Sequence, residues 1–166
     1  MKIKTGLFIV FSMFLFAACS QFETVYKNKN LLKNNVKVNV AGDMSQQASS
    51  YLASLLGTEV SDAKYTLFFS SSKTKKKLVI STSSVATKYR TTISSTYGLY
   101  DNILKCEVYN SEIVTSNDFD SRSEGYSFGS DAAEKNNELD NLKNNINIFI
   151  SEIDRYNDGL VCINEN

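Results

Sequence analysis

The sequence predicts an α+β fold in which two helices cover one face of a four-stranded mixed sheet, in the element order β-α-β-β-β-α. Two observations carry this prediction. Apolar and polar residues alternate with a period of two in several segments, as in strands that bury one face. Two further segments repeat apolar residues at helical spacing. A two-layer sandwich buries one face of such strands and one stripe of each helix together.

The strand patterns begin with alternating valines over 36–40. A second pattern starts at Tyr65 and alternates to Phe69, after which 70–77 is expected to be a polar connection. Another extended stretch follows over 78–80. Bounded alternation of this kind is typical of half-buried strands.

The longest strand pattern covers 85–99, where β-branched and aromatic residues dominate. The face expected to be buried carries Val85, Thr87, Tyr89, Thr91, Ile93, Ser95, Tyr97 and Leu99. Asp101 and Asn102 predict a tight reversal. The return strand is expected from Leu104 to about Ser116, and a polar loop is expected over 117–130.

Two helices are predicted from apolar stripes. The first covers about 44–56, and Asp43 is its expected N-cap. The second carries a single stripe over 139–156 and ends before Gly159, with Ser130 as its expected N-cap. Each stripe is what a helix needs to pack on a sheet, so both helices are expected in the core.

Composition limits the function. The chain has 166 residues with 18 basic and 18 acidic side chains, a balance that argues against nucleic-acid binding. Charge is uneven along the chain: 63–100 has basic residues and no acidic one, whereas 101–140 is mainly acidic. There is no histidine, which removes the commonest general base and zinc ligand. No nucleophile has an evident partner, so we expect neither an enzyme nor a cofactor.

The N-terminus has the pattern of a secretory signal. Two lysines precede an apolar run over 7–16, and two alanines follow directly before Cys19. This run is much shorter than the roughly 20 apolar residues that span a bilayer. Phe16-Ala17-Ala18-Cys19 resembles the bacterial lipobox, in which the cysteine receives a diacylglycerol and its new amino group an acyl chain such as palmitate. Several acyl chains together give stable anchoring. The alternative is an ordinary signal peptide with an incidental cysteine.

We therefore expect a signal peptide over 1–18, a lipidated tether over 19–35, one α+β domain over 36–158 and a flexible tail over 159–166. Ser20, rather than an aspartate, follows the cysteine. This favours delivery to the outer membrane of a Gram-negative bacterium, with the chain lipid-anchored on the periplasmic side.

Basic residues form two candidate sites for anions. Lys88 and Arg90 share the strand face opposite the predicted core, where an anionic lipid headgroup could bind; the alternative is ordinary solvent-facing charge. A run of four lysines in the polar connection is the second candidate, either as a phosphate-binding loop or as a solvated loop tip. This run consists of Lys73, Lys75, Lys76 and Lys77.

Cysteines and acidic residues give weaker candidates. Cys106 and Cys162 either form a disulfide in an oxidising compartment or remain unpaired thiols. Asp118, Asp120 and Glu124 lie in the predicted loop, but their spacing lacks the full calcium-loop pattern. No metal site is therefore expected.

Several short motifs occur in the order of a known family. Phe22-Glu23-Thr24-Val25-Tyr26 resembles an F-x-P-x-Y opening with Thr24 at the usual proline, and Tyr65-Thr66-Leu67 resembles a Y-x-L strand. Ala86-Thr87-Lys88-Tyr89-Arg90 resembles an A-T-x-x-R strand, and Tyr97-Gly98-Leu99-Tyr100-Asp101 resembles a Y-x-L-x-D turn. Tyr126-Ser127, followed by Ser130, Ala132 and Ala133, resembles the entry to a terminal helix. In this order, over most of 19–157, the chain resembles the LPS-assembly lipoprotein (LptE) family.

The resemblance implies a function. Members of this family sit as a plug inside a large outer-membrane β-barrel, an LptD-like translocon subunit that delivers lipopolysaccharide to the cell surface, and they help that barrel to fold. The family's strand arginine corresponds to Arg90, which would contact a lipopolysaccharide phosphate with Lys88 beside it. The alternative is an outer-membrane lipoprotein of similar fold with another envelope scaffold role or a small-ligand or lipid-binding role.

Overall fold

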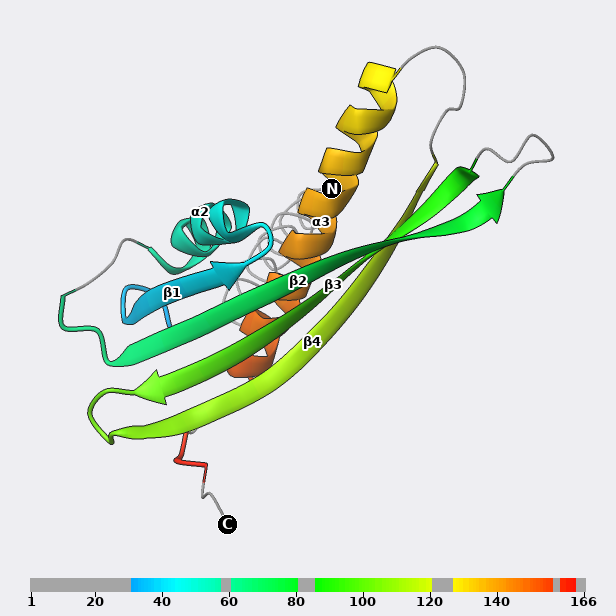
Figure 1. Cartoon of the computed structure of the whole chain (residues 1–166). Helices are drawn as coiled ribbons and strands as arrows, with labels where there is room; N and C mark the ends of the chain where they lie inside the picture. The colour runs from blue at the N-terminus through cyan, green and yellow to red at the C-terminus, as the bar shows by residue number, and fades with distance from the viewer. Residues whose placement is uncertain (1–30, 58–60, 81–85, 121–126, 157–158, 164–166) are drawn as a thin grey trace, which may run out of the picture.

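The computed structural model describes residues 31–57, 61–80, 86–120, 127–156 and 159–163. Its elements, in chain order, are β1 (Val36–Gly42), α2 (Ser45–Leu56), β2 (Tyr65–Ile80), β3 (Ala86–Asp101), β4 (Cys106–Asp120) and α3 (Ser127–Ile153). The strands form one sheet in the order β1-β2-β3-β4, in which only β1 and β2 run parallel. The predicted α+β class and element order are confirmed (Figure 1).

One hydrophobic core joins both helices to the same face of the sheet. Leu52 of α2 and Ile146 of α3 are fully buried in it. The strand parity expected for 85–99 is confirmed from residue 91 onward, because alternate residues of β3 are buried there. At the centre, the Tyr97 ring stacks on Phe149 of α3 with centroids 4.4 Å apart and meets Phe69 of β2 edge-on at 5.2 Å.

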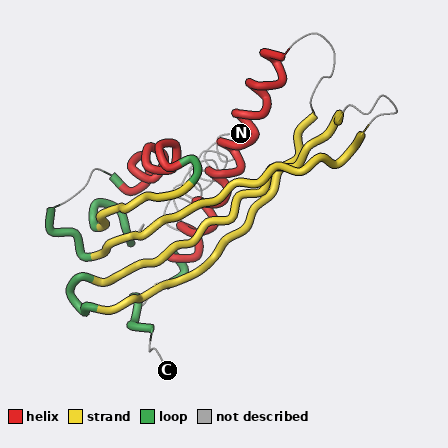
Figure 2. The backbone as a smooth tube through the Cα atoms, viewed as in Figure 1, coloured by secondary structure: helices red, strands yellow, loops and turns green. Residues whose placement is uncertain are grey.

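The expected polar connection over 70–77 is wrong, because β2 continues through it to Ile80. Every residue of this segment pairs with β3, from Ser70 opposite Thr96 to Lys77 opposite Tyr89. The polar side chains hid the strand, whose extension depends on backbone hydrogen bonds to β3 rather than on burial. Figure 2 shows β2, β3 and β4 as three long strands side by side, with β1 beside only one end of β2.

The expected helix starts differ from the structure. Met44, in the left-handed conformation at φ 58°, is the N-cap of α2 and makes no side-chain cap hydrogen bond. Asp43 instead ties β1 to β2: its N–H donates to the Ser71 carbonyl at 2.8 Å, and its carboxylate accepts the Lys73 N–H at 2.9 Å. The last helix, α3, begins ahead of Ser130, so that residue is not its cap.

The return strand is shifted from its expected position. It begins at Cys106 rather than at Leu104, which lies exposed in the turn. It continues to Asp120 through part of the expected polar loop. The turn itself matches the prediction. The buried Asp101 carboxylate accepts the N–H groups of Ile103 and Leu104 at 2.8 and 2.9 Å. These hydrogen bonds fix the reversal between β3 and β4.

The folded domain is wider than the expected 36–158. Leu32 is completely buried in the core, and Asn34 N–H donates to the Leu56 carbonyl at 2.7 Å. At the other end Leu160 is also buried, and Ile163 N–H donates to the Glu107 carbonyl at 2.8 Å. Residues 31–35 and 159–163 therefore belong to the domain rather than to a tether and a flexible tail. The expected signal peptide and Cys19 lie outside the described residues.

Candidate functional site

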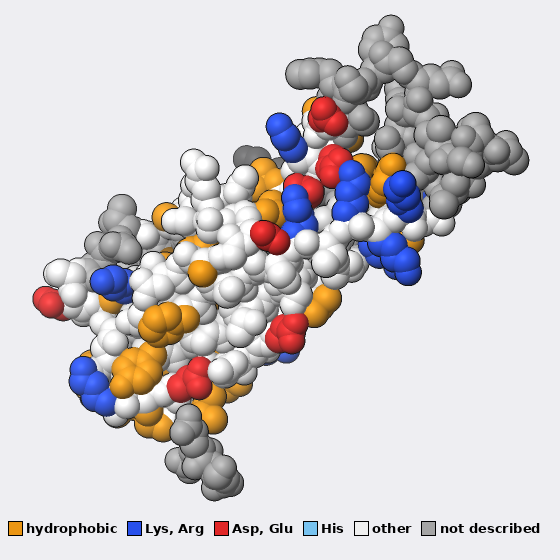
Figure 3. Space-filling view, viewed as in Figure 1, with side chains coloured by type: hydrophobic (Ala, Val, Ile, Leu, Met, Phe, Trp, Pro, Cys, Tyr) orange, Lys and Arg blue, Asp and Glu red, His pale blue; other side chains and the backbone are white. Residues whose placement is uncertain are grey.

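The face of the sheet opposite the helices is a broad polar surface. Among the described residues, no helix or strand covers it, and the sheet lies in front of α3 in Figure 1. Strand register sets its side chains in rows across β2, β3 and β4: Ser70–Thr96–Glu112, Ser72–Ser94–Val114, Thr74–Thr92–Ser116 and Lys76–Arg90–Asp118. We call these four rows the outer face. Figure 3 shows much of this side in white, the colour of the backbone and of uncharged polar side chains, with more of the charged side chains toward one end than the other.

Hydroxyl and carboxylate groups of the outer face bond to one another across strands. The Thr92 and Ser116 hydroxyls lie 2.8 Å apart, and the Ser94 hydroxyl donates to the Glu112 carboxylate. Such cross-strand pairs hold side chains in fixed positions. The face is thus an ordered array of hydrogen-bonding groups.

Arg90 and Lys88 do lie on this side of the sheet, but Asp118 is between them. Arg90 donates to both Asp118 carboxylate oxygens, from Nε at 2.7 Å and from Nη2 at 3.1 Å. The Lys88 ammonium lies 3.9 Å from the same carboxylate. Hydrogen bonding to Arg90 lowers the pKa of Asp118, and the same contact raises the pKa of Arg90. A phosphate would therefore compete with Asp118 for Arg90, although solvent-exposed ion pairs of this kind are weak.

The lysine run does not form a loop, because alternation along β2 divides its side chains between the two faces. Lys76 pairs with Arg90 in the last row of the outer face. Lys73 instead points toward the helices, where its ammonium lies 2.8 Å from the Glu138 carboxylate of α3. The expected loop is therefore wrong: both alternatives for this run, a phosphate-binding loop and a solvated loop tip, assumed a loop where the structure has a strand.

Lys75 is also occupied by α3 contacts. Its ammonium lies 2.6 Å from the Glu134 carboxylate and 4.5 Å from the centre of the Tyr89 ring. The Phe119 ring, stacked on Tyr89, is 5.2 Å from the same ammonium. Together with the Lys73 pair, this contact joins the far end of the sheet to α3, so its role is structural.

The acidic residues of the expected loop are also separated. Asp118 and Asp120 lie on β4, with Asp118 bound to Arg90, and Glu124 falls outside the described residues. In the part of the chain that the structure describes, no group of three or more acidic or cysteine side chains is placed to hold a metal ion.

Cys106 and Cys162 form a disulfide with their Cα atoms 5.7 Å apart. Of the two alternatives left open by the sequence, the structure has the paired state. The bond fastens the C-terminal segment to the first residue of β4, next to the buried Leu160. It supports the fold and adds no reactive thiol.

Sequence reasoning missed a buried polar cluster between α3 and the sheet. Asn145, fully buried, donates to the Ile113 carbonyl at 2.8 Å and accepts the Tyr97 hydroxyl at 2.6 Å. Asn141, one turn earlier, donates to the Thr91 carbonyl at 3.0 Å. Burial raises the pKa of Tyr97, so its hydroxyl stays a proton donor. The signal was present: two asparagines four residues apart interrupt the apolar stripe of α3.

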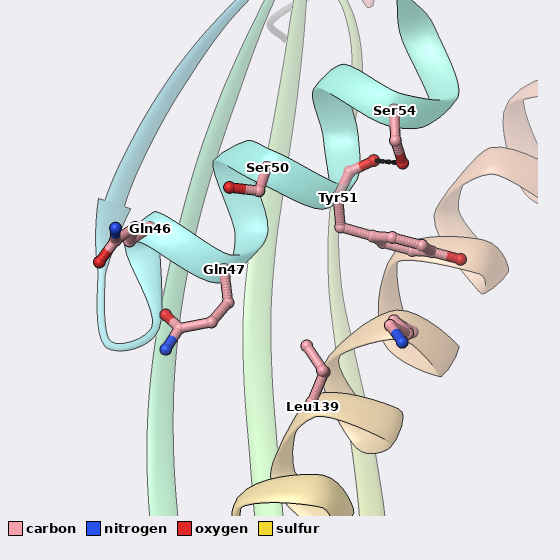
Figure 4. A pocket seen from close by; sticks show the side chains of 7 residues that line it. Gln46, Gln47, Ser50, Tyr51, Ser54 and Leu139 are labelled. Atoms are coloured by element: carbon pink, nitrogen blue, oxygen red, sulfur yellow. Dashed lines mark hydrogen bonds between the residues drawn. The ribbon is translucent and has the colours of Figure 1, made fainter.

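A groove of about 540 Å³ lies between α2 and α3 (Figure 4). It is lined by Gln46, Gln47, Ser50, Tyr51 and Ser54 of α2 and by Leu139 and Lys143 of α3. The Tyr51 hydroxyl donates to the Asn147 side chain at 3.0 Å, which joins the two helices. The groove contains no acid, and the Lys143 ammonium lies 5.9 Å from the Tyr51 ring centre. These groups form no nucleophile–base pair.

Within the described ranges, no helix has the length and apolar character needed to cross a membrane.

Comparison with known proteins identifies a shared fold. No family model matches the chain, and no curated protein sequence matches it. A putative lipoprotein from Caulobacter crescentus has 16% identity and a TM-score of 0.59, covering 78% of this chain and 93% of that one. The rare lipoprotein B from Shewanella oneidensis has 11% identity and a TM-score of 0.51, covering 71% and 93%. An uncharacterized lipoprotein B from Nitrosomonas europaea has 12% identity and a TM-score of 0.53, covering 76% and 90%. The chain therefore has a fold found in bacterial lipoproteins.

Proposed function

We propose that this chain is an outer-membrane lipoprotein that acts as plug and assembly partner of an LptD-like β-barrel, which inserts lipopolysaccharide at the cell surface. The lipobox-like sequence ending at Cys19 supports lipid anchoring. The fold shared with bacterial lipoproteins, rare lipoprotein B among them, supports membership of this class of envelope protein. The role is one of binding and assembly, with no catalytic step.

The observation that carries the proposal is the outer face. The interior of an outer-membrane barrel is polar and often water-filled, so a protein enclosed there needs groups that exchange hydrogen bonds with the wall or with water. Three rows of the outer face, from Ser70 to Ser116, supply hydroxyl, carboxylate and valine side chains on one strand surface. The apolar residues of the core cluster are meanwhile buried between the sheet and the helices.

The charged end of the face supports a lipopolysaccharide contact. Lys76 and Arg90 are exposed and lie beside each other, and Asp118 neutralises only part of their charge. Lys75 is paired with Glu134 of α3, so its ammonium is less available to bind a phosphate. Among the basic residues considered, Arg90 is therefore the best placed to exchange its carboxylate partner for a lipid phosphate.

The experiment is a pull-down of the tagged full-length chain from its own host after detergent extraction. We expect a large β-barrel in near-equal amounts. Ser72→Arg, in the middle of the outer face, should reduce recovery of the barrel. Ser49→Arg, the same change at an exposed position of α2, should leave it unchanged. Recovery of the chain alone would overturn the proposal and favour a different envelope scaffold or ligand-binding role.

A further inference from the structure

We propose a second role for this side of the sheet: a hollow beside the outer face binds an uncharged saccharide. The inference goes beyond the barrel role and does not require it. Register places one residue from each strand in a single row across the whole sheet, Asn39–Phe68–Gly98–Asn110. These residues, with neighbours from the adjacent rows, line a cavity of about 390 Å³.

Phe68 is the unusual residue of the row. Its side chain is 51% exposed, whereas its neighbours Leu67 and Phe69 are buried in the core. A large aromatic ring on a mostly polar strand face is available for contact with a ligand. The π face of such a ring is negative, and it attracts the weakly positive C–H groups on one side of a sugar ring.

Gly98 creates the space next to this ring. A glycine weakens a strand, and its backbone here is not in the left-handed region that would favour glycine. An added Cβ would lie 3.3 Å from the Glu107 carboxylate oxygen and 3.9 Å from the Phe68 Cβ. The missing side chain thus keeps open the hollow between the ring and the carboxylate.

The rim of the hollow carries the groups that recognise sugar hydroxyls. Asn110 donates to Glu107 Oε1 at 2.9 Å and holds that carboxylate in place. Asn39 stands at the opposite end of the row, and Ser70 and Thr96 add hydroxyls along one side. Amides both donate and accept, and a carboxylate accepts from paired hydroxyls. An apolar platform with a few fixed polar groups is the usual composition of a small-molecule site.

The charge of the residues that line the hollow favours an uncharged ligand. No lysine or arginine lines the hollow, and its one ionisable side chain is the carboxylate of Glu107. A phosphate or a carboxylated sugar would therefore be repelled. A metal ion would find a single carboxylate among neutral groups, and a bare acyl chain would leave the amides and hydroxyls without partners.

The test is saturation-transfer NMR on the purified mature chain, kept in a detergent whose headgroup is not a sugar. The probes are two uncharged trisaccharides, chitotriose with N-acetyl groups and maltotriose without them, together with the anionic trigalacturonic acid. Saturating the aromatic protons of the protein should transfer signal to an uncharged trisaccharide. Comparing the two uncharged probes shows whether N-acetylated or plain hexose chains are the source of the ligand.

Three variants test the geometry. Phe68→Ala should raise the Kd about tenfold, as expected for loss of one aromatic contact, and Phe68→Tyr should restore binding. Gly98→Ala should fill the hollow and weaken binding with the ring still present. The control is Ile103→Ala, which removes another large apolar side chain, 70% exposed in the β3–β4 turn, and should change nothing.

The inference is overturned if neither uncharged trisaccharide receives signal, if trigalacturonic acid binds equally well, or if Ile103→Ala weakens binding as much as Phe68→Ala. A loss of barrel recovery in Phe68→Ala without any sugar binding would also overturn it and make the ring a protein contact. The NMR measurement with trisaccharides needs no barrel, and the pull-down needs no sugar. Each experiment can therefore fail without the other, which distinguishes failure of the saccharide site from failure of the barrel role.

Discussion

Asn145 offers the sharpest test of how the helix layer is held to the sheet. Tyr97 is fully buried, and its hydroxyl donates to the Asn145 side-chain carbonyl at 2.6 Å. Asn145→Ala removes this acceptor. It also removes a donor to the Ile113 carbonyl. A buried polar group left without a partner costs about 1–3 kcal/mol. With the small cavity that the truncation leaves, we expect the free energy of unfolding to fall by about 3 kcal/mol.

A double-mutant cycle separates the hydrogen bond from the packing. Tyr97→Phe alone should cost about 1.5 kcal/mol, because the Asn145 carbonyl then loses its partner. In the double variant the Tyr97 hydroxyl and the Asn145 carbonyl are both gone, so neither is left without its partner. The combined cost should therefore fall short of the sum of the single costs by about 1 kcal/mol.

The assay is urea unfolding of the mature chain, followed by far-UV circular dichroism, with the disulfide intact. Asn144→Ala is the matched control, because Asn144 is exposed on the same helix turn, and its effect should stay within about 0.5 kcal/mol. Strictly additive single costs, or a loss at position 145 no larger than at position 144, would refute the assigned role of the buried amide.

Three further predictions follow from the same contacts. Replacing Cys106 and Cys162 together by Ser should lower the free energy of unfolding by up to about 4 kcal/mol, since the bond closes a loop with a sequence separation of 56; a change below about 1 kcal/mol in urea unfolding would contradict this. Burial raises the pKa of Asp101, but the N–H groups of the turn and a nearby lysine outweigh it and hold that pKa below its ordinary value of 3.8. The ionised Asp101 therefore stabilises the fold above pH 4, and this stability is lost as the pH falls through the lowered pKa. The difference in free energy of unfolding between wild type and Asp101→Asn should shrink on acidification. A difference that stays constant with pH would argue against the turn contacts. Arg90→Glu should weaken binding to lipopolysaccharide vesicles more than Lys75→Glu, and equal effects would mean that the strand holds no specific phosphate contact.

The periodicity of the sequence predicted the strands and helices where one face is apolar. It did so for Leu52 and Ile146, because burial of an amphipathic stripe is a local pattern. It failed over 70–77, where Lys73 and Lys75 sit in a strand that hydrogen bonding to β3 maintains. It also failed at Asp43, whose short side chain satisfies the cap pattern yet bonds to the neighbouring strand.

The candidate site was predictable only in part. Alternation along the chain placed Lys88 and Arg90 on the face away from the core, which agrees with the strand register and with their shared contact to Asp118. No local pattern could show that Asp118 lies opposite Arg90, because that contact depends on the register of two long antiparallel strands. The separation of Lys75 from Lys76 onto different faces likewise followed only once 70–77 was known to be a strand.

The fold class, the element order, the buried face of the long strand from residue 91 onward and the lipobox-like N-terminus could all be predicted from short-range composition and periodicity. Contacts between distant segments could be read only from the folded structure. That structure brought Asn39, Phe68, Gly98 and Asn110 into one row and joined Cys106 to Cys162. The physical reason is that strand register and helix packing are set by contacts between distant segments, and side chains on neighbouring strands become neighbours only when those contacts form.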